Sequence, residues 1–487
     1  MIAAPSGSPT AADPETQYAL VINHGRVIDP ETGLDAIRHL GVRDGRIAAI
    51  SEMPLSGRVQ LDATGLVVAP GFIDIHSHSL TPLGQRRNVL DGITTQLETE
   101  AGALPARAAG DSVAAMPLIN YGASAGHFVA RLKVIEDSAL PYFFYRGQQA
   151  SMGSPAFTQR ANRQQIATMR ALLARGLDEG GLGIGLLLDY MQAAVTADEL
   201  DMIFSLAGER NVPVFVHVRR FLPGDPTGLN EVLALAEEHG APVFICHITH
   251  SAMGGVGQWL AAIDAARQRG VRVATETLTY LAGGTSIGAD VFRERDWRQI
   301  FAIDYGDVQW VATGEWLTEE RWQHLAATQP GGMVNHHYVQ EDWLLTALRW
   351  PDMMVSTDAL PAFETRQLTN PNISGSFALL LGQYTRDKKI LSLSEAVART
   401  SLKQAQWLES FAPVFRRKGR IQEGMDADIT VFDPKSIAAV ADYGQPWENS
   451  RGIHWVIVNG SLTVAEGDLV EGAAAGQYLD SRGSPPD

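Results

Sequence analysis

The chain has 487 residues, of which 45% are hydrophobic and 19% are charged, a composition typical of a folded globular protein rather than a disordered or fibrous one. Its 55 acidic and 39 basic side chains give a formal charge of −16, which argues against a nucleic-acid partner because phosphates require a basic surface. A small anionic substrate stays compatible with this charge, since neighbouring arginines such as Arg219 and Arg220 can form a local positive pocket.

The composition also predicts a cytoplasmic protein that is not inserted in a membrane. The single cysteine, Cys246, cannot form an internal disulfide, and the first residues lack a basic segment followed by an apolar one. No uninterrupted apolar run reaches the roughly 20 residues of a membrane-spanning helix. The expected partner is a small-molecule substrate, and assembly into a homo-oligomer is left open.

The two ends of the chain share a β-rich pattern. Residues 1–17 are small, contain prolines and lack periodicity, so we expect a disordered tail. Short β-like segments separated by tight turns follow over residues 18–67, and the same pattern returns over residues 416–475. Because isolated hairpins are only marginally stable, both ends are predicted to combine into one small β-sandwich domain.

Residues 68–415 show a different pattern, in which short apolar runs alternate with segments of helical periodicity. Such alternation predicts a parallel sheet with crossover helices, closed most simply into a (β/α)8 barrel of the α/β class. The predicted strands cover 94–99, 182–188, 212–218, 242–248, 271–275, 309–312 and 353–356. The predicted helices cover 163–175, 197–209, 229–238 and 257–268.

The most informative motif is the segment 71–78, in which two histidines two residues apart close a strongly apolar run. Alternate residues of a strand project from the same face, so His76 and His78 are expected to chelate a single divalent metal. The alternative is a purely structural role for both rings. A metal site requires further ligands from distant parts of the chain.

Polar residues at the ends of other predicted strands are candidates for those ligands, since the reactive groups of such barrels lie at the carboxyl ends of the strands. Taken singly, each has an ordinary explanation as a cap or a solvated loop residue. Together they would be costly to bury unless a cation compensated them. The candidates are Glu98, Glu100, His217, His247, His250 and Asp358.

With these motifs the chain resembles the amidohydrolase superfamily, and within it the N-acyl-D-amino-acid deacylases, which include N-acyl-D-glutamate deacylases. The segments that carry the resemblance are 67–78, 91–95, 275–283 and 419–429. The resemblance extends from Tyr18 to about Val470. It implies a metal-dependent (β/α)8 barrel beside a small β-sandwich, with one or two divalent ions, expected to be Zn²⁺. It further implies one metal held by His76, His78 and Asp358 and a second held by His217 and His247, with a bridging ligand between them.

The bridging ligand departs from familiar members, many of which use a carbamylated lysine or a cysteine after the second strand. The chain has six lysines, and the only one between the two pairs of histidines is Lys133, in a helix-like segment. Glu100 is therefore the expected bridge because it lies nearer the carboxyl end of its strand, and Glu98 is the alternative. Cys246 alternates with His247 and is predicted to point away from the barrel axis into apolar packing.

The resemblance implies hydrolysis of an amide by metal-activated water, with Asp358 as the proton shuttle. Arg219, two residues beyond His217, is predicted to bind the α-carboxylate of the substrate. Tyr190 and Tyr280 are predicted to line the substrate, and an ordinary packing or surface role is the alternative for all three.

Two alternatives to deacylation of an N-acyl-D-amino acid remain at this stage. The segment 370–377 lacks the arginine that the family often carries there, so the substrate could be a different amide, including a cyclic amide of the hydantoinase or dihydroorotase type. The scarcity of lysine disfavours the cyclic-amide alternative. A catalytically silent assembly subunit is the second alternative, and the full set of ligand residues disfavours it.

Overall fold

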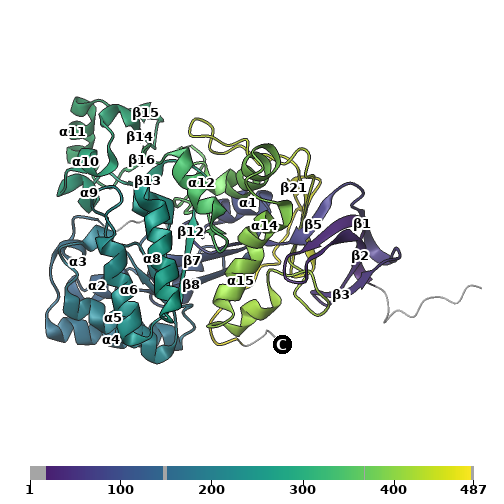
Figure 1. Ribbon diagram of the computed structural model, residues 1–487, viewed down its shortest axis with the longest axis horizontal. Coiled ribbons are helices and arrows are strands. Elements are labelled where there is room, and N and C mark those ends of the chain that lie inside the picture. Colours follow the sequence, from purple (N-terminus) through teal and green to yellow (C-terminus); the bar gives the residue numbers. More distant parts are fainter. Residues whose placement is uncertain (1–17, 146–150, 367, 484–487) are drawn as a thin grey trace, which may run out of the picture.

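The computed structural model describes residues 18–145, 151–366 and 368–483, so the predicted tail over residues 1–17 lies outside the described part. Eight parallel strands form a nearly closed barrel, which confirms the predicted fold class (Figure 1). The backbone N–H of Asp358, after the last strand, donates to the carbonyl of His76, after the first, over 2.8 Å. In chain order the strands are β6 (Phe72–Asp74), β7 (Ile93–Ala103), β8 (Asn120–Gly126), β9 (Ile184–Leu186), β10 (Val214–Val216), β11 (Val243–Ile245), β12 (Val273–Thr277) and β17 (Met354–Val355).

Helices cover the outside of the barrel (Figure 1). They include α1 (Pro82–Leu90), α2 (His127–Ile135), α4 (Arg163–Asp178), α5 (Ala197–Arg210), α6 (Thr227–His239), α7 (Ile248–Ala252), α8 (Val256–Gln268), α12 (Glu341–Arg349), α13 (Asn372–Leu379), α14 (Leu393–Val397) and α15 (Lys403–Leu408). The four predicted helices are confirmed as α4, α5, α6 and α8. The start of α4 is fixed by a capping box, in which Asn162 and Gln165 exchange side-chain to backbone hydrogen bonds of 2.9 Å.

Strand β8 has no counterpart among the predicted strands. Its sequence, Asn-Tyr-Gly-Ala-Ser-Ala-Gly, lacks the β-branched residues that mark a strand. The small residues are required by close packing, because a Cβ on Gly126 would lie 2.7 Å from the carbonyl oxygen of Ala101 on β7. Tertiary packing, rather than local propensity, therefore makes this segment a strand.

The predicted barrel strand over residues 309–312 is wrong in its placement. The strand found there, β14 (Val308–Trp310), belongs to a separate four-stranded antiparallel sheet (Figure 1). The segment that forms this sheet is inserted in the chain after β12 and before β17. The other strands of that sheet are β13 (Gly283–Ser286), β15 (Glu315–Trp316) and β16 (Met333–His336), and the helices beside it are α9 (Asp290–Arg293), α10 (Trp297–Phe301) and α11 (Glu319–Thr328). A short apolar run does not by itself distinguish an inserted strand from a barrel strand.

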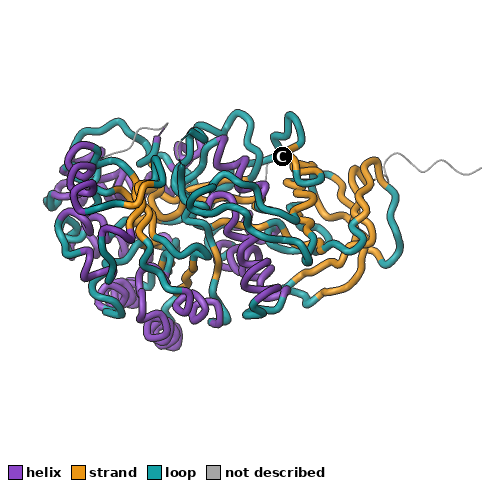
Figure 2. The backbone as a smooth tube through the Cα atoms, turned by 90° about the horizontal axis from the view of Figure 1, so that it is seen from above, coloured by secondary structure: helices purple, strands orange, loops and turns teal. Residues whose placement is uncertain are grey.

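Both ends of the described chain contribute to one nine-stranded sheet, which lies beside the barrel (Figure 2). Its N-terminal strands are β1 (Tyr18–Asp29), β2 (Leu34–Arg43), β3 (Arg46–Ser51), β4 (Gly57–Asp62) and β5 (Val67–Pro70). Its C-terminal strands are β18 (Ile429–Phe432), β19 (Ile453–Val458), β20 (Ser461–Ala465) and β21 (Asp468–Leu469). The two ends join where β5 pairs antiparallel with β18. The predicted boundary between residues 67 and 68 falls inside β5, and the domain boundaries stay a prediction.

Strand β5 connects the two cores and leads directly into the histidine motif. Val67 and Ala69 pack with Phe72 against the helices of the barrel, whereas Val68 faces the opposite apolar cluster of the terminal sheet. This alternation follows from the two-residue period of a strand buried on both faces. The start of the first barrel strand is therefore anchored on both sides.

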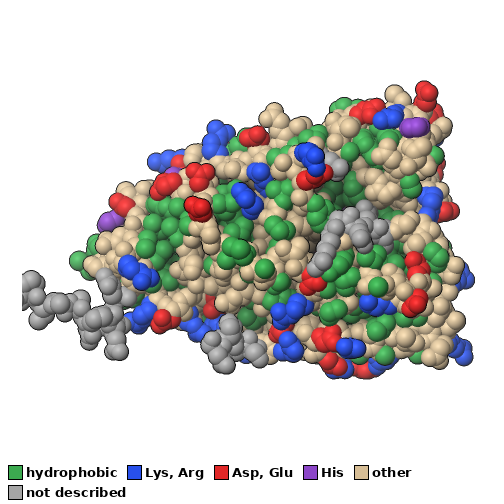
Figure 3. Space-filling model, turned by 180° about the vertical axis from the view of Figure 1, so that it is seen from behind, with side chains coloured by type: hydrophobic (Ala, Val, Ile, Leu, Met, Phe, Trp, Pro, Cys, Tyr) green, Lys and Arg blue, Asp and Glu red, His purple; other side chains and the backbone are tan. Residues whose placement is uncertain are grey.

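The described helices include none with the length and apolar character needed to span a membrane. On the face opposite that of Figure 1, acidic and basic side chains are interspersed among neutral and hydrophobic ones (Figure 3).

Candidate metal centre

The two histidines of the first motif converge, although their local structure differs from the prediction. Strand β6 ends at Asp74, so His76 and His78 lie in the turn that follows rather than on one face of a strand. Their Nε2 atoms are nevertheless 3.4 Å apart. The buried carboxylate of Asp74 shapes this turn, because it accepts hydrogen bonds from the backbone N–H and the hydroxyl of Thr357, at 3.0 and 2.6 Å.

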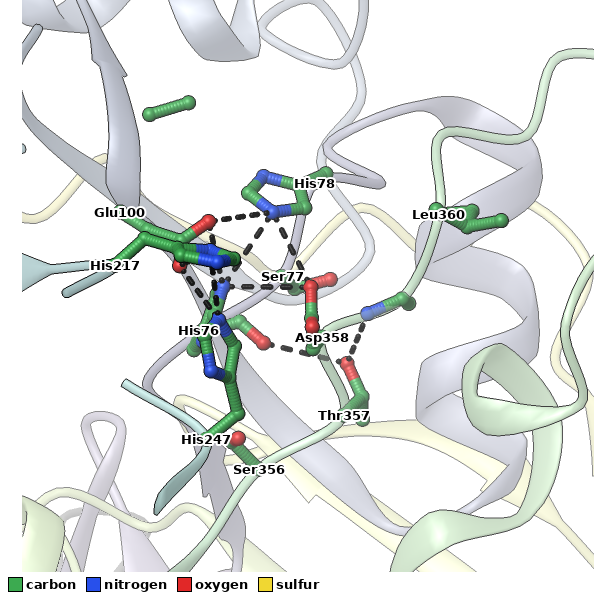
Figure 4. Close-up of polar contacts among 12 residues, drawn as sticks. His76, Ser77, His78, Glu100, His217, His247, Ser356, Thr357, Asp358 and Leu360 are labelled. Atoms are coloured by element: carbon green, nitrogen blue, oxygen red, sulfur yellow. Dashed lines mark hydrogen bonds and ion pairs between the residues drawn. The ribbon is translucent and has the colours of Figure 1, made fainter. Parts of the chain in front are cut away.

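Glu100, on β7, lies between two pairs of histidines (Figure 4). Its Oε2 atom is 3.5 Å from Nε2 of His76 and 3.4 Å from Nε2 of His78. Its Oε1 atom is 3.1 Å from Nδ1 of His217 and 2.8 Å from Nε2 of His247. One oxygen thus faces each pair, which is the arrangement that a carboxylate bridging two metal ions requires.

Asp358 completes the first group of side chains. Its Oδ1 atom is 3.4 Å from Nε2 of His76 and 3.2 Å from Nε2 of His78. Burial alone would raise the pKa of Asp358, but the neighbouring imidazoles His76 and His78 outweigh it and lower the pKa to about 2. Its side chain is 21% exposed, against 3% for that of Glu100, so Asp358 is the acidic group of the pair that a substrate can reach.

Backbone strain marks two of these positions. His247 has a φ of 35° and Asp358 a φ of 45°, both in the left-handed region that side chains other than glycine rarely adopt. Such conformations cost on the order of 1–3 kcal/mol and are concentrated at functional sites. Both residues lie two or three positions beyond the end of a barrel strand, where the backbone turns their side chains towards Glu100 and the histidines.

Three of the four histidines have their outer ring nitrogen engaged by an oxygen atom, an arrangement typical of histidines that bind metals. The pairs are His76 with Glu276 (3.0 Å), His78 with Glu98 (2.8 Å) and His247 with Ser251 (3.1 Å). The exception is His217, whose Nε2 has no hydrogen-bond partner among the described residues and lies 3.8 Å from Asp189. The remaining ring nitrogens all point into the centre.

This donor set fits a divalent metal. Ring nitrogens face each other at 3.4 Å in one histidine pair and at 3.1 Å in the other, so each pair could direct two nitrogen donors at one cation. Burial would lower the pKa of His76, but Asp358 and Glu100 outweigh it and raise it well above the usual value. Burial would also lower the pKa of His78, but Glu98, Asp358 and Glu100 outweigh it and raise that pKa well above the usual value. A divalent ion carries the same charge as the two protons it would replace, and nitrogen and carboxylate donors suit Zn²⁺. Two compatible groups are His76, His78 and Asp358, and Glu100, His217 and His247.

Glu98 and His250 lie outside both of these groups. Glu98 instead accepts a hydrogen bond from His78 and a short one from the hydroxyl of Tyr142, so its geometry suits orientation of His78. His250 lies on α7 with its ring centroid 6.3 Å from that of His247, and burial lowers its pKa to about 3.

The predicted orientation of Cys246, away from the barrel axis, is wrong. Along β11 and the residue that follows it, Val243 and Ile245 pack outwards, whereas Phe244 and Cys246 pack into the barrel interior. The prediction assumed that His247 continued this alternation, but its left-handed backbone brings it back towards the centre. Cys246 and His247 therefore both point inwards.

Tyr190 is the one predicted substrate residue that the structure brings to the cavity over the centre. This cavity, about 420 Å³ when the space at its open mouth is included, is lined by His78, Glu100, Tyr190, His217, His247 and Asp358 together with mostly apolar side chains. The ring centroid of Tyr190 lies 4.8 Å from that of His217, and its hydroxyl accepts a hydrogen bond of 3.1 Å from Thr285. Its own O–H is then free to donate towards a ligand.

Arg219 and Tyr280 are placed elsewhere. The guanidinium of Arg219 pairs with Glu231 on α6 and donates to the carbonyl of Val195 over 2.7 Å. The hydroxyl of Tyr280 donates to the carbonyl of Ala441 over 2.8 Å. Arg219 was predicted from strand alternation beyond His217, but β10 ends at Val216, so that alternation no longer applies.

The buried arginine near the centre is the adjacent residue, Arg220. It donates to Asp189 from its backbone N–H and its Nε atom, at 2.8 and 2.9 Å, and Arg295 reaches the same carboxylate at 3.1 Å. Burial alone would raise the pKa of Asp189, but Arg220 and Arg295 outweigh it and hold that pKa far below its usual value. From the sequence, Arg220 was a candidate for a local positive pocket, but its pairing with Asp189 and the approach of Arg295 were missed; the only signal for this group was its position just beyond strands β9 and β10.

Glu276 was also missed as a functional residue, although it lies on β12 within a segment noted for its resemblance. Replacing Glu276 with glutamine should lower zinc affinity by about 10- to 100-fold, because the carboxylate that orients His76 and accepts the backbone N–H of His247 at 2.5 Å is lost. Competition with a chelator measures this effect. The exposed Glu320→Gln variant is the control, and unchanged affinity in Glu276→Gln would contradict the orienting role.

Comparison with known proteins indicates the class of enzyme to which this metal centre corresponds. No family model matches the chain. The chain is 29% identical to the N-acyl-D-glutamate deacylase of Alcaligenes xylosoxydans xylosoxydans over 91% of this chain and 92% of that protein. It is 28% identical to the D-aminoacylase of the same organism, over 95% and 97% of the two chains.

Two solved structures of deacylases have a fold similar to that of this chain. A D-aminoacylase structure matches with a TM-score of 0.78 at 23% identity, over 95% of this chain and all of that one. The N-acyl-D-glutamate deacylase from Bordetella bronchiseptica, complexed with zinc and a phosphonate mimic of the tetrahedral intermediate, matches with a TM-score of 0.76 at 26% identity, also over 95% of this chain. The protein is thus an amidohydrolase, an enzyme that hydrolyses C–N bonds. Within that class, these similarities support the D-aminoacylase branch.

Proposed function

We propose that this protein is a metal-dependent deacylase that hydrolyses N-acyl-D-amino acids, with N-acyl-D-glutamate as one candidate. The observation that carries the proposal is the position of Glu100, whose two oxygens face separate histidine pairs. The similarity to two deacylases over nearly the whole chain supports the substrate class.

In this proposal His76, His78 and Asp358 would hold one zinc ion, His217 and His247 would hold a second, and Glu100 would supply an oxygen ligand to each. When bound, the metal would lower the pKa of a water molecule and polarise the carbonyl oxygen of the amide. Asp358 accepts a proton from the attacking water through its partly exposed carboxylate. It then passes that proton to the amide nitrogen as the C–N bond breaks, which yields a free amine and a carboxylic acid.

The walls of the cavity support an apolar acyl group. Its apolar lining residues include Phe143, Phe144, Met152, Leu187, Met333 and Leu360. Tyr190, with its hydroxyl proton free, is positioned to donate a hydrogen bond to the substrate. Burial of the acyl chain against these side chains would supply binding energy at about 25 cal/mol per Å² of apolar surface.

A second candidate substrate is a neutral amide. Among the described residues that line the cavity there is neither an arginine nor a lysine, so the described lining offers no cation to an α-carboxylate. This observation favours an amide without a free carboxylate. It leaves the proposed chemistry at the metal centre unchanged.

Activity should disappear when the protein is treated with a chelator and return when zinc is added, because the proposed reaction requires the metal to activate water and polarise the amide carbonyl. The assay compares N-acetyl-D-glutamate, its L-enantiomer, N-acetyl-D-leucine and N-acetyl-D-leucinamide. Faster turnover of D- than L-substrates is the expected result. Preference for the leucinamide over the leucine would select the neutral-amide candidate. Hydrolysis of hydantoins alone would contradict the deacylase proposal.

The proposal also includes a cytoplasmic location, a small-molecule substrate as the partner, and no nucleic-acid partner. The single cysteine and the net charge of −16 support these points. Assembly into a homo-oligomer is left to a measurement of mass in solution.

A further inference from the structure

Cys246 lies directly against the proposed metal centre, although neither the proposed ligand sets nor the mechanism uses it. It is the only cysteine of the chain and is fully buried. Its Sγ atom, a ring nitrogen of His76 and a carboxylate oxygen of Glu100 all lie within 4.8 Å of one another. Ligand atoms at such separations can share one metal ion without a large movement of the backbone.

The surroundings of Cys246 set it apart from an ordinary buried thiol. Below it, the interior of the barrel is filled by apolar side chains, including Leu97, Phe215 and Phe244. Above it lie the polar atoms of His76 and Glu100. The thiol therefore occupies the boundary between an apolar floor and the donor set.

An independent observation indicates that a cation belongs at this boundary. Nε2 of His76 faces Nε2 of His78 at 3.4 Å, and both of these rings direct their other nitrogen to a carboxylate. The same Nε2 of His76 lies 3.5 Å from Glu100. Thiolate sulfur is among the strongest zinc donors in proteins.

We propose that Cys246 supplies a thiolate ligand to the metal ion held between His76 and Glu100. This inference rests on the proposed function, because it requires the metal centre. Coordination breaks the S–H bond and forms a sulfur–metal bond, and the thiol proton leaves to solvent. The negative charge of the thiolate would offset the part of the charge of the metal ions that Glu100 and Asp358 do not balance.

Zinc K-edge X-ray absorption on the full-length, zinc-loaded protein tests the proposal. The expected result is a sulfur shell at about 2.3 Å, distinct from nitrogen and oxygen ligands at about 2.0–2.2 Å. This shell should be lost in Cys246→Ser and retained in Met354→Leu, which removes the other sulfur of the same interior cluster. The wild-type spectrum decides the question even if Cys246→Ser fails to fold.

The two proposals fail in different ways. A zinc-loaded, active enzyme whose spectrum contains only nitrogen and oxygen ligands would overturn the role of Cys246 and leave the proposed function standing. A protein that takes up no zinc would overturn both. A sulfur shell that persists in a folded Cys246→Ser variant would also overturn the assignment to this residue.

Discussion

Replacing Asp358 with asparagine is expected to lower kcat by about 10²- to 10⁴-fold, the range that general acid–base catalysis contributes. Asparagine keeps the shape of the side chain but cannot accept the proton of the attacking water. The carboxylate lies 3.2 Å from His78 and is partly exposed to the cavity, so no other described acid of the centre is equally accessible to substrate. Steady-state kinetics on zinc-loaded protein, with metal content measured in parallel, gives the result.

Two further measurements separate the roles of Asp358 as ligand and as shuttle. If zinc content is retained while kcat falls, the lost function is proton transfer, and if zinc content falls as well, coordination contributes. The exposed Asp468→Asn variant on β21 should keep wild-type kinetics. Turnover at the wild-type rate in Asp358→Asn would refute both roles.

Replacing Glu100 with alanine should remove both the bound metal and turnover. The side chain places one oxygen 2.8 Å from His247 and the other 3.4 Å from His78, so its loss takes a ligand from both histidine pairs at once. Removing the buried carboxylate also leaves converging imidazoles without a counter-charge, a change that costs several kcal/mol when one partner of a buried pair is deleted. Metal analysis, kinetics and thermal unfolding together measure these effects.

Glu98→Gln is the matched control for this variant, because Glu98 lies two residues earlier on the same strand but, of the four histidines, contacts only His78, at its outer nitrogen. We expect Glu98→Gln to weaken metal binding without abolishing it. The assignment of Glu100 as the bridge fails if Glu100→Ala keeps its metal and its turnover. Loss of the bound metal in the Glu98 variant alone would transfer the role to Glu98.

The sequence predicted those elements of the fold that are marked by a pattern of neighbouring residues. Helices such as α4 and α8 have apolar residues at helical spacing, and the β-rich character of both chain ends is visible in their turns. Strand β8 was missed because its small residues carry no strand propensity of their own and are selected by close contact with β7. Residues 309–312 were assigned to the wrong sheet, since a short apolar run does not specify its partner strand.

For the candidate site, the sequence by itself determined which chemical groups are available: paired histidines, acids at strand ends, and no lysine placed to bridge two metals. Only the tertiary structure decided their directions. The left-handed backbone at His247 turns that ring inwards although Cys246 before it also points inwards, and the end of β10 at Val216 sends Arg219 to α6 while Arg220 is buried. Side-chain identity is encoded locally, but orientation beyond the last hydrogen-bonded residue of a strand depends on contacts with residues far away in the chain.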